Sequence, residues 1–155
     1  MSSSSNVRSV IGRVRTSYPR LLRILVPLDF SGKSRQALRY AVPLAQKFSA
    51  RIHLVHVLPD PGKASKDELI RQRLAAMKRL GQTAAQLMPP RLHAENAVLT
   101  GKPADEILAL AEKNSIDLIV LTTKGRSGLK RALVGSTAEQ IMRHALCPVM
   151  SVRRR

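Results

Sequence analysis

Short apolar runs alternate with longer amphipathic segments along the chain. Each short run is rich in branched side chains, a pattern typical of a buried strand. The predicted strands are 22–28, 51–57, 94–100, 117–122 and 148–152. Apolar residues at helical spacing fill the stretches between them. The predicted helices run from a serine cap at Ser31 or Ser34 to about Phe48, and over 65–87, 103–114 and 138–146.

The regular alternation of strands and helices predicts an α/β fold. Strands with continuous apolar runs, separated by helices, indicate a single-domain, open five-stranded parallel sheet with helices on both faces. In the long segment 65–87, five apolar residues fall on one helical face, which we expect to pack on the sheet. These residues are Ile70, Leu74, Met77, Ala84 and Leu87.

Composition narrows the class of protein. The chain has 155 residues, the length of one domain, and no apolar run approaches the roughly 20 residues that span a bilayer. A lone cysteine, Cys147, leaves no intrachain disulfide, which fits a reducing compartment. No apolar core of a secretory signal is present in the first 20 residues. We therefore expect a cytoplasmic protein.

Charge is concentrated at the two ends of the chain. Twenty-seven Lys and Arg against 10 Asp and Glu give a formal charge of +17, which attracts polyanions. Residues 1–20 are rich in serine and arginine and lack acids, so we expect a flexible basic tail before a domain over 21–155. A transit peptide has the same composition, and organelle targeting stays an alternative. The tail and the final three arginines could also hold nucleic acid non-specifically.

The stretch 122–137, TTKGRSGLKRALVGST, joins a predicted strand to a predicted helix and combines glycine, hydroxyl and positive charge. Ligands of an open parallel sheet bind beyond the carboxyl ends of its strands. Glycine permits close backbone approach, and a helix N-terminus favours anions. The stretch is therefore a candidate phosphate site around Gly125, Gly135, Ser136 and Thr137. Alternatively, Ser136 or Thr137 only caps the helix and the glycines only turn the chain.

A second glycine-containing stretch, PLDFSGKS at 27–34, ends like a P-loop. Its first position is Pro27 instead of glycine, and proline has no N–H for a phosphate. We therefore interpret Lys33 as a solvated lysine of the first helical turn. His53 and His56 lie three apart in a strand, on opposite faces, so a shared metal is not expected.

Several segments together resemble the universal stress protein family. They are ILVPLDFSGKSRQALRYAVPLA, IHLVHV, GKPADEILALAEKNSIDLIVLTTKG and GSTAEQIMRHALCPVMSV, and they span roughly residues 22–153. The resemblance implies a Rossmann-like sheet in the order 3-2-1-4-5, of the adenine-nucleotide hydrolase-like kind. It also implies a homodimer paired through the last strand, 148–152.

The resemblance further implies a site for ATP, with Mg²⁺ as counter-ion, in the subset of the family with the pattern G-x2-G-x9-G-[ST]. Gly125 and Gly135-Ser136 match its second half, whereas Thr122 replaces its first glycine. By the same carry-over, Asp29 meets the adenine. The implied nucleotide-binding residues are Pro27, Leu28, Asp29, Val57, Leu121, Thr122, Gly125, Arg126, Gly135, Ser136 and Thr137.

The resemblance supplies no reaction, and no general base is evident beside the phosphate site. At most it is compatible with slow ATP hydrolysis or autophosphorylation, so we expect an ATP-binding regulator of the stress response. Two other readings stay open. One is a dimeric scaffold that binds no nucleotide, and the other is a basic protein associated with nucleic acid. Few aromatic residues are available to stack on bases, which weakens specific recognition.

Overall fold

The computed structural model describes residues 20–62, 65–123 and 135–153 of the chain. Five parallel strands form one sheet in the order β3-β2-β1-β4-β5, as predicted. The strands are β1 (Arg23–Pro27), β2 (Arg51–Leu58), β3 (Ala94–Thr100), β4 (Leu118–Thr122) and β5 (Val149–Val152). The helices are α1 (Gly32–Phe48), α2 (Lys66–Leu87), α3 (Pro103–Lys113) and α4 (Ser136–His144). The predicted basic tail lies almost wholly outside the described residues.

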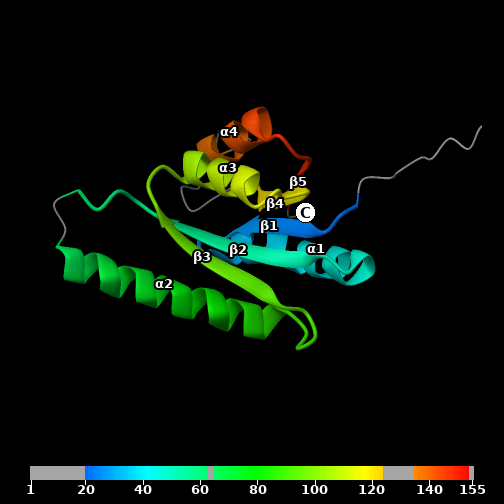
Figure 1. The fold of residues 1–155 in the computed structure, drawn as a ribbon, viewed down its shortest axis with the longest axis horizontal. Coiled ribbons are helices and arrows are strands. Elements are labelled where there is room, and N and C mark those ends of the chain that lie inside the picture. Colours follow the sequence, from blue (N-terminus) through cyan, green and yellow to red (C-terminus); the bar gives the residue numbers. More distant parts are fainter. Residues whose placement is uncertain (1–19, 63–64, 124–134, 154–155) are drawn as a thin grey trace, which may run out of the picture.

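Two hydrophobic clusters sandwich the sheet (Figure 1), with α1 and α2 on one face and α3 and α4 on the other. Successive side chains of a strand point to opposite faces of the sheet and so pack alternately in the two clusters. In β1, Ile24 and Val26 pack toward α1 and α2, whereas Leu25 packs toward α3 and α4. All three are fully buried, so both faces of the central strand are covered.

The apolar face predicted for α2 is wrong in its first half. Ile70, Leu74 and Met77 are exposed, whereas Leu80 and Thr83 are buried. Length explains the difference, because a helix of 22 residues extends for about 33 Å and a strand of 7 residues for about 23 Å. The N-terminal half of α2 therefore runs past the sheet, as Figure 1 shows.

The last helix also differs from its predicted boundaries. α4 begins at Ser136 instead of residue 138, and its N-cap is Gly135, with no side-chain hydrogen bond at the cap. The alternative in which Ser136 or Thr137 is the capping residue is therefore wrong. Both residues lie in the first turn, and their backbone N–H groups have no carbonyl partner within the helix.

Candidate functional site

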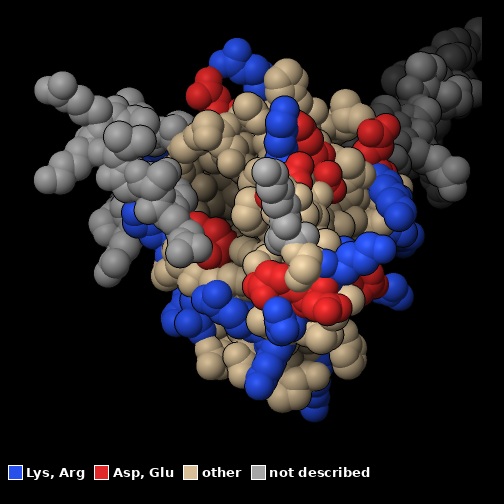
Figure 2. Space-filling view, turned by 90° about the vertical axis from the view of Figure 1, so that its left-hand side faces the viewer, with Lys and Arg blue, Asp and Glu red and all other residues tan. Residues whose placement is uncertain are grey.

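A cavity of about 330 Å³ opens at the carboxyl ends of β1, β2 and β4. These three strands are neighbours in the sheet, so their last residues converge with the N-terminal parts of α3 and α4. Figure 2 views the molecule from this end and shows a hollow in its surface. The volume falls within the range of small-molecule sites, which is about 300–1,000 Å³.

The cavity wall on the side of α3 and α4 is apolar. Val55 and Val57 from β2 and Leu121 from β4 line it together with Ile107 of α3 and Ile141 of α4. All five belong to the hydrophobic cluster on that face of the sheet. Such a wall suits a flat, weakly polar group, such as a base or the carbon face of a sugar.

Asp29 lies on the cavity rim, in the connection between β1 and α1. Its Oδ1 accepts a hydrogen bond of 2.9 Å from the Ser31 backbone N–H. Ser31 is the N-cap of α1, and its Oγ accepts a hydrogen bond of 3.1 Å from the Ser34 N–H. The turn thus orients the carboxylate, and this helix N-terminus is closed by its own serine.

The N-terminus of α4 borders the cavity. Gly135, Ser136 and Thr137 all line the cavity. The Gly135 N–H donates to the Thr123 carbonyl oxygen at 2.6 Å, which ties the start of α4 to the end of β4. The N–H groups of a first helical turn have no carbonyl partner within the helix, and together with the helix dipole they favour an anion at this point.

Nine of the eleven residues that the sequence predicted for a nucleotide site line this cavity. They are Pro27, Leu28, Asp29, Val57, Leu121, Thr122, Gly135, Ser136 and Thr137. The other two, Gly125 and Arg126, lie outside the described residues. The structure therefore brings together segments that are up to 110 positions apart in the sequence, because the sheet order places β1 beside β4.

Sequence reasoning missed eight lining residues, namely Ser34, Val55, His56, Pro103, Ile107, Thr123, Ala138 and Ile141. Proximity to a strand end could have signalled Val55, His56 and Thr123, because each lies within two positions of a predicted site residue. The α3 residues gave no such signal. Their helical spacing marks them as core without saying which end of the sheet they cover.

Other candidate chemistry is limited. Across residues 20–62, 65–123 and 135–153, no group of three or more His, Cys, Asp or Glu is placed to hold a metal ion. Burial raises the pKa of the Cys147 thiol, which keeps it in its less reactive form. A search of the helices in the described part of the chain found none with the length and apolar character of a membrane span.

Comparison with known proteins identifies relatives along nearly the whole chain. Residues 21–153 match the sequence model of the universal stress protein family. Universal stress protein MJ0531 of Methanocaldococcus jannaschii is 35% identical over 142 residues, which cover 85% of this chain and 82% of that protein.

Solved structures match the fold as well. Universal stress protein UspA from Lactobacillus plantarum has a TM-score of 0.73 and 30% identity, and the match covers 88% of this chain and 100% of that one. A universal stress protein from Archaeoglobus fulgidus, solved in complex with dAMP, has a TM-score of 0.65 and 20% identity, with coverage of 86% and 99%. This more distant likeness shows the shared fold.

Proposed function

Because the chain belongs to the universal stress protein family, we propose that it is a stress-response regulator that binds ATP in the cavity described above. The observation that carries the proposal is the convergence of an apolar wall, a fixed carboxylate and a glycine-capped helix N-terminus on one cavity. Each of these three features matches one part of an adenine nucleotide. The dAMP complex of the Archaeoglobus fulgidus relative supports adenine as the base.

The adenine and ribose would lie against the wall formed by Val57, Leu121 and Ile107, near Pro27. Asp29 would accept a hydrogen bond from the exocyclic amine of adenine. Guanine presents a carbonyl oxygen at the corresponding ring position, and a carboxylate would repel it. The protein would therefore prefer ATP to GTP.

The phosphates would lie at the N-terminus of α4. Backbone N–H groups of Ser136 and Thr137, their hydroxyls and the helix dipole would stabilise the negative charge. Mg²⁺ would arrive with the nucleotide and neutralise part of the phosphate charge. Gly125 and Arg126 would complete the phosphate site from the loop after β4. In this proposal the protein binds the nucleotide as a signal, and no hydrolysis is needed for its function.

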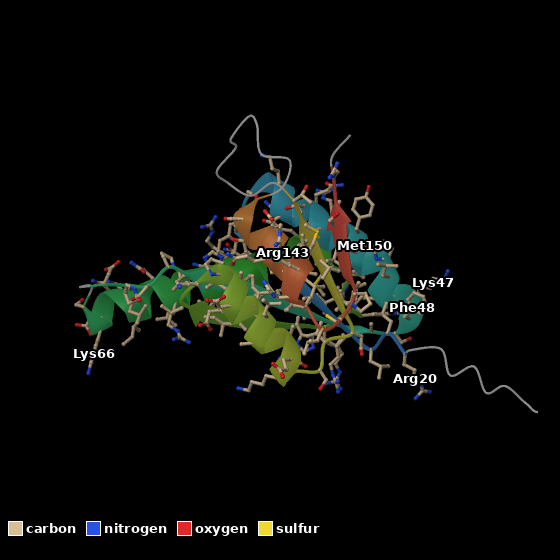
Figure 3. All side chains as sticks on the ribbon, turned by 90° about the horizontal axis from the view of Figure 1, so that it is seen from above. Arg20, Lys47, Phe48, Lys66, Arg143 and Met150 are labelled. Atoms are coloured by element: carbon tan, nitrogen blue, oxygen red, sulfur yellow. The ribbon has the colours of Figure 1, made fainter. Side chains whose placement is uncertain are left out.

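We propose further that two copies pair through β5. This strand ends the sheet order, so its outer edge has no partner strand among the described elements. Met142, Leu146 and Met150 leave 39%, 87% and 36% of their surfaces exposed around it. Figure 3 shows Met150 on β5 at a margin of the molecule. Pairing across a two-fold axis would cover both the open edge and these apolar side chains.

A cytoplasmic location fits this function, because ATP is abundant there and a lone thiol stays reduced. The nucleic-acid alternative depends on the basic ends of the chain, which lie mostly outside the described residues. On the face seen in Figure 2, blue and red side chains are interspersed and form no single basic stripe. We therefore do not put this alternative forward as a second function.

The test has two steps. Mass spectrometry of protein purified under native conditions should detect a bound adenine nucleotide. Titration calorimetry should then show Mg-ATP binding more tightly than Mg-GTP, and Asp29→Ala should reduce that preference by about tenfold, the equivalent of one lost hydrogen bond. If the folded parent binds neither nucleotide, the proposed function is wrong and the scaffold reading gains support.

A further inference from the structure

Beside the cavity, on the side of the sheet covered by α1 and α2, two side chains gather around Phe30. Strand alternation directs Val55 and Val57 toward α3 and α4 and His56 toward α1 and α2. The His56 ring lies 4.3 Å from the Phe30 ring, between centroids, and the Arg79 guanidinium lies 4.0 Å from the Phe30 centroid. The Phe30 ring is therefore held by a side chain from β2 and a side chain from α2.

His56 is also tied to the segment that forms the cavity rim. Its Nδ1 lies 2.6 Å from the Leu28 carbonyl oxygen. Because a carbonyl only accepts, Nδ1 must carry the proton and donate it. The Leu28 N–H in turn donates to the Val55 carbonyl oxygen at 2.8 Å. Both backbone polar groups of Leu28 are thus fixed to β2, one residue before Asp29.

Phe30 shows why this turn needs support. Its φ of +61° lies in the left-handed region, which bulky residues rarely adopt. Such a conformation persists when the surrounding structure holds it in place. The contacts of the Phe30 ring with His56 and Arg79 stabilise this conformation. The reversal of the chain at Phe30 then lets the Ser31 N–H reach Oδ1 of Asp29.

We propose that His56 is a positioning residue, which fixes Leu28 and Asp29 through its Nδ1–H and through Phe30 and thereby sets the selectivity for the base. In this role His56 acts through Leu28, Phe30 and Asp29, and Arg79 of α2 packs on the same Phe30 ring. The selectivity part rests on the proposed function. The positioning part stands on the geometry alone, and the two are tested separately.

The selectivity test compares three variants by calorimetry with Mg-ATP and Mg-GTP. His56→Leu removes the donor and should weaken ATP about tenfold while lowering the ATP-to-GTP preference by a similar factor. His56→Asn keeps an N–H in the place of Nδ1 and should bind ATP within about threefold of the parent. His53→Leu, on the same strand but facing away, is the matched control and should keep the parent preference. If folded His56→Leu binds both nucleotides as the parent does, the inference is wrong.

The positioning test needs no nucleotide. Amide hydrogen exchange at Ser31, whose N–H is bonded to Asp29, should be about tenfold faster in His56→Leu than in the parent. It should stay at the parent rate in His56→Asn and His53→Leu, and Arg79→Ala should give an intermediate rate. Failure of the parent to bind any nucleotide would contradict the proposed function alone. Unchanged exchange in His56→Leu would contradict the positioning role itself.

Discussion

Replacing Gly135 with valine separates the phosphate half of the proposed site from the adenine half. Gly135 has φ −71° and ψ 148°, an extended conformation that any residue adopts. Valine should therefore cost little backbone strain and leave α4 in place. Its branched side chain would stand at the start of the helix, in front of the amides of Ser136 and Thr137. The phosphates would lose their closest approach to these amides.

The expected size of the effect follows from the number of contacts. A hydrogen bond to a charged group contributes about 1.5–3 kcal/mol. Loss of both first-turn amides would weaken Mg-ATP by about 3–6 kcal/mol, and each 1.4 kcal/mol is about tenfold in affinity. We therefore expect a loss of at least about a hundredfold. Adenosine lacks phosphates and should bind within about threefold of the parent.

Titration calorimetry with Mg-ATP and with adenosine measures both effects, and thermal unfolding shows that the variant is folded. Lys33→Ala is the matched control, because Lys33 is exposed at the α1 terminus that Ser31 already caps. A folded Gly135→Val protein with the ATP affinity of the parent would refute the phosphate assignment. Equal losses of adenosine and ATP would show that valine closes the whole cavity.

Three other changes test separate features. Met150→Lys should turn the proposed dimer into a monomer by light scattering, and an unchanged assembly would rule out the β5 interface. Burial lowers the pKa of His53 more than the nearby Glu95 raises it. Its folded pKa is below the unfolded value, so stability is complete above about pH 6.5 and falls as the pH drops toward the folded pKa. Urea unfolding from pH 7.5 to 5 should show a shallower loss for His53→Leu, and identical slopes would contradict this assignment. Thr122→Gly should change ATP affinity by less than about threefold, because strand alternation turns Thr122 away from the apolar wall. A large gain in ATP affinity would show instead that the Thr122 Cβ obstructs the site.

The layered fold could be predicted because periodicity reports burial directly. β1 and β4 are apolar on both faces, and only a sheet covered by helices on both sides buries such strands. The α2 face could not be predicted in the same way. Ile70 and Leu74 have the spacing of core residues, yet both are exposed. The N-terminal half of α2 extends beyond the sheet, so no described strand covers it. Periodicity within a helix carries no information about the length of the neighbouring surface.

Some residues of the candidate site could likewise be predicted from the sequence, and others could not. Asp29, Val57 and Thr122 are implied by the family resemblance, and each lies at or directly after the end of a predicted strand, where parallel strands of a sheet meet at one edge. His56 also lies near a strand end, but its interest lies in its contact with Phe30, which is 26 positions away and also packs against Arg79. Side-chain contacts between a loop residue and residues distant in the sequence produce no periodic pattern that sequence analysis could detect.

Motif matching alone does not distinguish two helix N-termini as candidate phosphate sites. The stretch 27–34 ends in Gly-Lys-Ser at the start of α1, and 135–137 offers Gly-Ser-Thr at the start of α4. Capping distinguishes them. At α1 the Ser31 hydroxyl already accepts the Ser34 N–H, so a phosphate would have to displace an internal hydrogen bond. At α4 the cap is a glycine, which has no side chain to accept a first-turn N–H, so an anion would displace no capping side chain of Gly135. The state of the cap therefore decides which of two similar sequences can serve as an anion site.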